Sequence, residues 1–434
     1  MLNRENFLSE IKPYVIKMRR DFHRYPELGF TEYMTTYKIV QELKDTCFQI
    51  YIGQDALVPG ERFGVPDDEI LKEAEQFALQ NGVPQGFIEK VAGGNTGVVA
   101  CFDTGKRGKH VAFRFDIDAL PILESDSDAH FPKKEGFASL RKGIMHACGH
   151  DGHTAIGLAV AKYIDAMKDQ LTGKYTLLFQ PAEEGGRGAY AMVAKGWLDD
   201  VEYFISGHLG ITNKEVGVIA STATKFLAST KMNVEFQGES AHSGVEPNKG
   251  KNALLAAAAA SIHLNSIPRH KDGATRINVG KLVAGSGRNV IPDHAYMEIE
   301  TRGETSELAE YMKEQAIRII DASSKLYDVK AEITYAGRTL STPCDPEWKE
   351  IVKQANKNNP YVTEIVDEVE MGGSEDVTFM MEQVQERGGI ATYLVFSSPL
   401  PAGHHHPQFD FKEDALMTAV STFVHLIDYL NSDR

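Results

Sequence analysis

The order of the expected helices and strands changes part-way along this chain, and that change limits the possible folds more than any other feature. Before residue 222, four apolar segments with the length of strands alternate with helical patterns, at 96–103, 110–117, 174–181 and 201–208. From 222 to 338 the order becomes strand, helix, strand, strand, helix, strand, which is that of a ferredoxin-like unit. Alternation then resumes and ends in a helix at 413–431.

This order predicts an α/β domain, with a mixed or mostly parallel sheet flanked by helices, that is interrupted by a smaller α+β domain. The first domain would comprise 1–221 and 339–434, and the inserted domain 222–338. A chain of 434 residues is long enough for two domains. The segment 45–95 has a helical pattern near 68–80, and we expect it to be an insertion that covers one edge of the core.

Composition and charge limit the partners of the protein. A formal net charge of −15 argues against nucleic acid and anionic membranes, because both require clustered lysine and arginine. The longest strongly apolar run, Ala253–Ile262, is far too short to span a bilayer. The four cysteines are widely spaced, which is typical of a reducing compartment. With no signal-peptide pattern at the N-terminus, we expect a cytoplasmic location.

The segment HACGHDGH, residues 146–153, contains three histidines and a cysteine within eight residues. A cysteine thiolate and neutral histidines are ligands for transition metals such as Zn, Mn, Ni or Co. Cys148 and His150 would converge on one point if this segment is an irregular turn that enters a helix. The alternative is that Cys148 is a small buried apolar residue and the histidines are capping or core residues. For His146 and His153 we favour packing in the turn and helix.

Three further segments offer metal ligands or a general base. In FQPAEEG, Glu183 and Glu184 directly follow a buried strand, so one can ligate a metal while the other acts as a base. Such a pair is otherwise a solvated surface feature. His208 ends another strand, where a lone histidine is more often structural. The segment GHHHPQFDF, residues 403–411, holds three more histidines, of which at least one is a candidate ligand.

Together these donors are one thiolate, several imidazoles and one or two carboxylates, enough for two metal ions. Two-metal sites activate water and polarise a carbonyl group, which suits amide hydrolysis. A competing hypothesis makes Cys148 a nucleophile with a nearby histidine as its base. That hypothesis leaves the two glutamates without a role.

Taken together, these segments resemble the M20 metallopeptidase family, in its aminoacylase-like amidohydrolase branch. The matching segments are RRDFHRYPELGFTE (19–32), RFDIDALPI (114–122), GIMHACGHDGHTA (143–155), FQPAEEG (179–185), GHLG (207–210), ESAHSGVEP (239–247), GSGRNVIPDHA (285–295), GGSEDVTFMM (372–381) and HHPQFDF (405–411). Within the branch, segment 45–95 and the runs TRINVG and SGRNVIP make the chain most similar to the group that forms the first subunit of p-aminobenzoyl-glutamate hydrolase.

The resemblance implies a role for individual residues. It implies two divalent metal ions, Mn or Zn with Ni or Co as further options, and these metal ligands: Cys148, His150, Glu184, His208 and His405. The family's ligand histidine stands two residues before a proline, which selects His405 over His404 and His406. The remaining implied roles are general base for Glu183, carbonyl polarisation for His242, orientation of the site for Asp118, and substrate contact for Asn289 and Arg302.

The activity implied by the resemblance is cleavage of the amide bond of an N-aroyl or N-acyl amino acid. The first expected substrate is p-aminobenzoyl-glutamate, which would give p-aminobenzoate and glutamate. Hippurate-like and other N-acyl amino acids are the alternatives. The resemblance also implies a homodimer or a heteromer with a related chain, and in the second case low activity of this chain alone.

Overall fold

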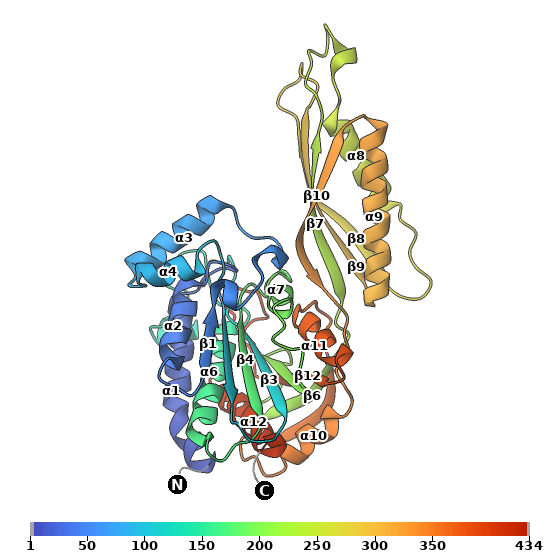
Figure 1. Ribbon diagram of the computed structural model, residues 1–434. Coiled ribbons are helices and arrows are strands. Elements are labelled where there is room, and N and C mark those ends of the chain that lie inside the picture. The colour runs from blue at the N-terminus through green and yellow to red at the C-terminus, as the bar shows by residue number, and fades with distance from the viewer. Residues whose placement is uncertain (1–3, 432–434) are drawn as a thin grey trace. The chain divides into compact units, whose positions relative to one another are not determined.

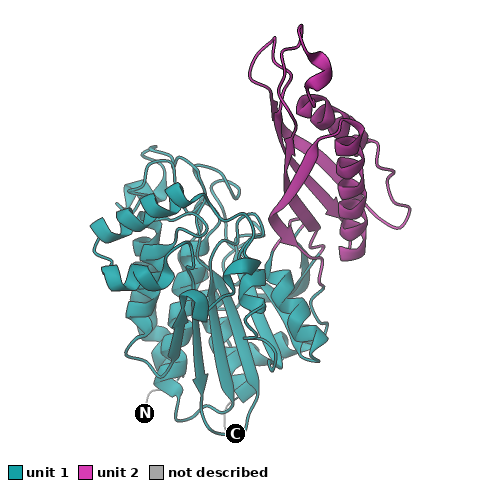
Figure 2. Ribbon diagram, turned by 45° about the horizontal axis from the view of Figure 1, so that its top comes forward, with its two compact units in different colours: residues 1–224, 343–371, 376–434 teal, residues 225–342, 372–375 magenta. Residues whose placement is uncertain are grey.

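The structure is a computed structural model that describes residues 4–431, and these form two compact units (Figure 2). Unit 1 comprises the chain up to Thr224, Pro343–Met371, and the chain from Asp376 onward. Unit 2 comprises Lys225–Thr342 together with the short segment Gly372–Glu375. The sequence prediction set the inserted domain at 222–338 and did not include this second short segment.

Unit 1 is built around an eight-stranded mixed sheet with the order β1-β2-β4-β3-β5-β12-β6-β11 (Figure 1). Its strands are β1 (Gln49–Ile52), β2 (Val98–Asp103), β3 (His110–Asp116), β4 (Lys174–Gln180), β5 (Tyr203–Leu209), β6 (Val218–Thr224), β11 (Glu364–Glu370) and β12 (Ile390–Phe396). The four central strands β4, β3, β5 and β12 are parallel to one another. Strands β1 and β2 are antiparallel to their neighbours, and β6 runs antiparallel to β12.

In the part of unit 1 that the structure describes, ten helices surround this sheet or pack on the helices next to it. They are α1 (Arg4–Arg24), α2 (Tyr33–Leu43), α3 (Asp68–Gln80), α4 (Gln85–Val91), α5 (Phe131–Lys134), α6 (His150–Met167), α7 (Ala189–Val193), α10 (Trp348–Ala355), α11 (Val377–Glu386) and α12 (Asp414–Asn431), with short 3-10 turns at Gly53–Asp55 and Pro59–Glu61. Helix α6 is almost fully buried, since it packs on β3 and β4 and is covered by α1, α2 and α12. Helix α11 packs on β12 and β5.

Segment 45–95 contributes a strand as well as the helix that its pattern predicts. Strand β1 pairs with β2 and extends the sheet at its edge. Helices α3 and α4 pack around the buried ring of Tyr33 and form a small apolar cluster of their own. The sequence pattern did not predict β1, because a four-residue strand carries too little periodicity to stand out.

Unit 2 has a four-stranded antiparallel sheet with the order β10-β7-β9-β8, the ferredoxin-like order predicted from the sequence. Its elements are β7 (Ala228–Gln237), a 3-10 turn at Pro247–Lys249, α8 (Ala253–Asn265), β8 (Thr275–Ala284), β9 (His294–Gly303), α9 (Ser306–Leu326) and β10 (Lys330–Thr339). Asn252 and Thr305 each accept a backbone N–H at the start of a helix, which sets where α8 and α9 begin. The predicted fold class is thereby confirmed for both units.

Among residues 4–431, no helix combines the length and the apolar character needed to cross a bilayer. The parallel strands of unit 1 have a different consequence. In open α/β sheets, polar residues gather beyond the carboxyl ends of the strands. Asp118 follows β3, the two glutamates follow β4, and His208 lies at the end of β5.

Candidate metal centre

Side chains from four separate segments meet beyond the carboxyl ends of β3, β4 and β5. Cys148 lies in the turn before α6, and His150 is the first residue of that helix. Gly149 between them has a φ of +91°, a conformation that side-chain-bearing residues rarely adopt, and this turn brings both neighbours toward the strand ends. The loop that precedes α12 supplies further histidines.

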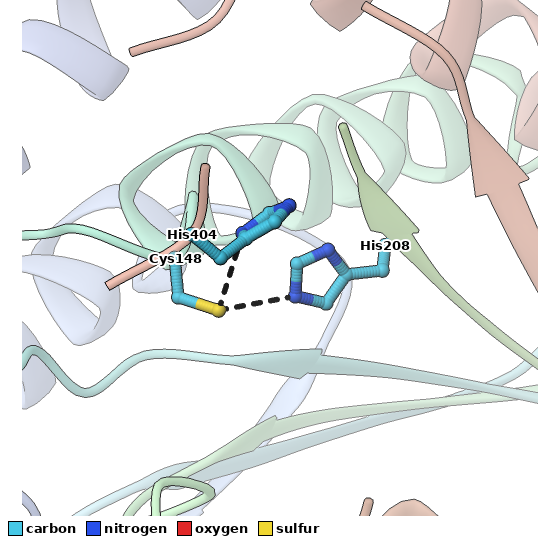
Figure 3. A group of neighbouring side chains, drawn as sticks. All are labelled: Cys148, His208 and His404. Carbon is cyan, nitrogen blue, oxygen red and sulfur yellow. Dashed lines mark hydrogen bonds between the residues drawn. The ribbon is translucent and has the colours of Figure 1, made fainter. Parts of the chain in front are cut away.

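One part of the centre is formed by Cys148, His208 and His404 (Figure 3). The thiol Sγ of Cys148 lies 3.4 Å from Nε2 of His208 and 3.6 Å from Nδ1 of His404. Nδ1 of His208 donates to the carbonyl of Leu209 at 2.7 Å, so the lone pair of the neutral ring is on Nε2 and faces the thiol. This geometry suits a metal ligand held by its second nitrogen.

The second part is formed by His150, Glu183 and Glu184, whose ligand atoms all lie within 4.8 Å of one another. Nδ1 of His150 donates to the carbonyl of Asp118 at 2.9 Å, so Nε2 is the nitrogen left for a metal ion. Burial disfavours the charged ring, but Asp116 and Asp118 raise the pKa of His150 to about 10, so a metal ion that binds Nε2 would have to displace a proton. Among residues 4–431, that buried Nε2 atom has no hydrogen-bond partner. A buried polar atom without a partner is costly, and because two carboxylates lie beside this one, it is a candidate metal-binding atom.

A third group joins these two parts. Cys148, Glu184 and His405 also have ligand atoms within 4.8 Å of one another, and Nε2 of His405 lies 3.3 Å from Oε1 of Glu184. His405 has a φ of +61°, which is uncommon for a residue other than glycine. No group contains both Cys148 and His150 among the described residues, but His208 and Glu184 each share one group with Cys148 and another with His150, so the groups overlap.

The donor set fits a pair of divalent transition-metal ions. It combines a thiolate, several imidazoles and carboxylate oxygens, the ligands that zinc and related ions prefer. Within the described part of the chain, Nε2 of His404, like that of His150, is buried without a hydrogen-bond partner. Burial lowers the pKa of His208 well below its usual value and that of His404 to about 4, so both rings are neutral, as metal ligands must be.

Asp118 contacts both glutamates and His150. Its Oδ1 accepts the backbone N–H of Glu183 and its Oδ2 that of Glu184, both at 3.0 Å. The same carboxylate lies 3.2 Å from Nδ1 of His150. Glu183 is only 6 % exposed, which shields its carboxylate from bulk water.

The histidines assigned to packing have different surroundings. His153 links two strands, because its Nδ1 lies 2.5 Å from Asp116 and its Nε2 accepts the backbone N–H of Leu209 at 3.0 Å. It stands three residues after His150 on the same helix face, a spacing from which a supporting role was predictable. His146 is buried, and neither of its ring nitrogens has a hydrogen-bond partner in the part of the chain that the structure describes.

Unit 2 contains the other three predicted site residues. His242 and Asn289 lie close together, since His242 bridges Val290 and the N–H of Ser243 donates to the carbonyl of Asn289 at 3.1 Å. Nδ1 of His242 accepts the N–H of Gly244 at 3.2 Å. Arg302 is apart from this pair. It lies near the end of β9, eight residues after His294, the first residue of that strand. At about 3.4 Å per residue, Arg302 is roughly 27 Å from His294.

Comparison with known proteins identifies the family of this chain. The model of peptidase family M20/M25/M40 matches residues 112–429. The chain is 42% identical to indole-3-acetyl-aspartic acid hydrolase of Enterobacter agglomerans and 41% identical to the first subunit of p-aminobenzoyl-glutamate hydrolase from Escherichia coli K12. Each alignment covers 96% of this chain and 95% of the relative.

Solved structures show the same relationship. An aminobenzoyl-glutamate utilization protein from Klebsiella pneumoniae has a TM-score of 0.84 and 36% identity, covering 98% of both chains. A dinuclear metal-binding M20 peptidase from Bacillus subtilis has a TM-score of 0.65 and 25% identity, covering 96% of this chain and 98% of the other. The chain therefore belongs to peptidase family M20/M25/M40 and is a metal-dependent amidohydrolase.

Proposed function

We propose that the protein cleaves the amide bond between an aromatic acyl group and an acidic amino acid, with p-aminobenzoyl-glutamate as its first substrate. The observation that carries this proposal is the buried Glu183 beside a cluster of metal-type donors. The choice of substrate is supported by the two relatives at 41–42% identity, whose names join an aromatic acyl group to aspartate or glutamate.

The metal ligands of the proposal are Cys148, His150, Glu184, His208 and His405. His404 is a further candidate because of its distance to Cys148. A pair of divalent ions bound there, Mn or Zn in the first place, would lower the pKa of water and polarise the amide carbonyl.

Glu183 is the proposed general base. Its carboxylate takes a proton from the attacking water as the oxygen–carbon bond forms at the amide carbonyl. It then gives that proton to the leaving nitrogen as the carbon–nitrogen bond breaks. The products are an acid and a free amino acid, so one water is consumed and no other reactant is needed.

His242 is the proposed donor to the developing oxyanion. Because its Nδ1 accepts the N–H of Gly244, the proton of the neutral ring is on Nε2, which is free to donate to an oxygen. Backbone geometry thus fixes the tautomer that stabilisation of an oxyanion requires. Asn289, directly beside His242, is the proposed contact for the substrate's polar groups.

The position of Arg302 bears on the oligomeric state. Arg302 lies near the end of β9, whereas His242 forms a bridge with Val290, which precedes the start of that strand, so an acyl amino acid is too short to reach both within one chain. We propose that a second protomer, either another copy or a related chain, supplies one of them. Two relatives are named as one of the subunits of p-aminobenzoyl-glutamate hydrolase, which supports a related chain as the partner. Light scattering of the purified protein decides whether it forms a dimer alone.

The test of the function is release of glutamate from p-aminobenzoyl-glutamate by the purified protein loaded with Mn, repeated after chelation. Hippurate and indole-3-acetyl-aspartate are measured in parallel. Metal-dependent turnover that is fastest with p-aminobenzoyl-glutamate supports the proposal. Faster turnover of hippurate would move the specificity to neutral amino acids, and no turnover of any of the three by metal-loaded protein would overturn it.

A further inference from the structure

Three consecutive backbone N–H groups beyond β4 point at two buried carboxylates. We call residues 181–185 the glutamate turn, because it carries Glu183 and Glu184. Asp118 accepts the N–H groups of both glutamates, as described above. The N–H just before them, that of Ala182, donates to Oε1 of Glu32 at 2.8 Å. Glu32 comes from a segment 150 positions earlier in the chain.

Glu32 is built into the interior of unit 1. Its exposed fraction is 0%, and it stands just before α2. Its second oxygen, Oε2, accepts the hydroxyl of Thr96 at 2.6 Å. Both oxygens are therefore occupied by donors from outside α2, and the side chain caps neither that helix nor another.

The turn that Glu32 holds has an uncommon backbone. Ala182 has a φ of +50°, in the left-handed region that residues with a side chain rarely enter. Such a conformation persists only where the surroundings hold it. The hydrogen bond to Glu32 is the contact that fixes this residue's N–H, and the next residue along the chain is the proposed base.

The segment that carries Glu32 also touches the loop after β3. The carbonyl of Glu27 accepts the N–H of Ala119 at 2.8 Å, and Leu28 forms a parallel bridge with Ala119. A Cβ added at Gly29 would lie 2.8 Å from the Cβ of Ala182, so only glycine fits against the glutamate turn. Residues 27–32 thus contact both polar loops beyond the sheet.

We propose that Glu32 is a positioning residue for the hydrolysis: it fixes Ala182 and thereby the direction in which Glu183 and Glu184 leave the strand. This inference rests on the proposed function only in giving Glu183 the role of base. Burial and the nearby charge of Asp118 raise the pKa of Glu32 to about 8. A neutral side chain of the same shape is therefore a close substitute for it.

The test compares Glu32→Ala and Glu32→Gln with a matched control. Glu27 is the control, because it is also a buried glutamate of this segment, 1% exposed, and accepts two hydrogen bonds, from the N–H groups of Met34 and Thr35. Its side chain does not reach the glutamate turn. Glu32→Gln keeps an oxygen for Ala182 and an amide group for Thr96.

Both alanine variants are expected to lower Tm, whereas only Glu32→Ala lowers kcat, by about 100-fold, as a misplaced catalytic group does. Its KM should stay near that of the wild type, and Glu32→Gln should restore most of kcat. Because Glu184 is a proposed metal ligand in the same turn, kcat of all variants is compared at saturating metal. Equal kcat for Glu32→Ala and Glu27→Ala, or a Glu32→Gln variant as slow as Glu32→Ala, would overturn the proposal. If Glu32→Ala does not fold, Glu32→Asp takes its place, since the shorter carboxylate cannot keep both partners.

Amide hydrogen exchange provides a measurement that does not depend on the substrate. Exchange in a peptide spanning 179–187 should be faster in the Glu32 alanine variant than in wild type, and unchanged in the Glu27 variant. If wild-type protein hydrolyses none of the amides tested, the proposed function fails, and hydrogen exchange still decides whether Glu32 holds the turn. Unchanged exchange in the Glu32 variant overturns the positioning role on its own.

Discussion

Oδ1 of Asp118 accepts a hydrogen bond from the backbone N–H of Glu183 at 3.0 Å, and the same oxygen lies 3.2 Å from Nδ1 of His150, so one carboxylate contacts both a proposed ligand and the proposed base. This relationship couples two tasks that are separable in principle: holding a metal ligand and aiming a proton acceptor. We therefore expect a change at Asp118 to affect metal affinity and rate together, and a change at Glu183 to affect the rate alone.

The first prediction concerns Asp118→Asn. An amide has one oxygen where the carboxylate has two, so either Glu183 or Glu184 loses its acceptor and faces an NH2 group instead. We expect metal affinity to fall about 10- to 100-fold, as for other residues that support ligands, and kcat to fall with it. Metal content after dialysis and kcat at saturating metal measure the two effects. Asp103 is exposed, so Asp103→Asn is the control. If Asp118→Asn keeps both the metal content and the kcat of the wild type, Asp118 does not link metal binding to the rate.

Glu183→Gln separates the base from the ligands. The amide cannot accept a proton, so kcat should fall by roughly 10³-fold, within the range for loss of a general base. Bound metal should stay at the wild-type level, because Glu184 is the ligand of the pair. Glu184→Gln should behave differently: it should lose bound metal, and kcat should fall because of that loss. Near-wild-type turnover by Glu183→Gln would show that another group is the base.

The reactivity of Cys148 distinguishes a metal ligand from a nucleophile. A metal-bound thiolate should be protected from iodoacetamide, and chelation should abolish activity and expose Cys148 to alkylation. Burial raises the pKa of Cys47 to about 12 and raises that of Cys101 and Cys344, so these thiols react slowly. Mass spectrometry of the alkylated peptide identifies the site. An enzyme that survives chelation but dies on alkylation would support the thiol mechanism.

His23 should make stability depend on pH. Burial disfavours its charge, but hydrogen bonds to Asp151 at 2.8 Å and Glu124 at 2.9 Å raise its pKa from 6.5 to about 9. Because the pKa of His23 is higher in the folded state, its charged ring stabilises the fold, fully so below pH 6.5. This stabilisation is lost as the pH rises toward 9. We expect the free energy of unfolding to fall across this window by at most roughly 3 kcal/mol. Denaturant unfolding measures it, and the decline should be absent in His23→Gln; an equal decline in both proteins would disprove the assignment.

Much of the site was predictable because it lies at strand ends. Asp118, Glu183 and His208 are polar residues that directly follow or end apolar runs, and parallel strands bring such positions to one edge. Glu32 has no such signal, since it lies in a loop before a helix and reaches the turn only through the tertiary fold. For Arg302, the strand that contains it was predictable from the sequence. Its distance from His242 was not, because that distance depends on how the strands of unit 2 pair.

The inserted unit was predictable for a different reason. Its order of strands and helices allows few topologies. The connections between its consecutive elements favour the topology that the structure has. The segment Gly372–Glu375 could not be assigned to it from sequence, because four residues carry no periodic pattern and their place depends on contacts formed after folding.

The last prediction separates the three consecutive histidines 404–406, which the sequence distinguishes only by their distance from Pro407. In the structure, Nδ1 of His404 lies 3.6 Å from Cys148, while Nε2 of His405 lies 3.3 Å from Glu184. The positive φ of His405 turns its ring toward that carboxylate, and strain of this kind is typical of functional positions.

His405→Ala should therefore lose about one metal ion per chain and most of kcat. His404→Ala should lose less, because its ring faces a thiol that His208 already contacts. The exposed His406, whose Nδ1 accepts the N–H of Gln408, is the control and should behave as wild type. We measure metal content by mass spectrometry and kcat for all three variants. The two values together show which histidine contributes most to metal binding. Loss of metal in His404→Ala with full retention in His405→Ala would transfer the ligand role to His404 and leave the rest of the donor set unchanged.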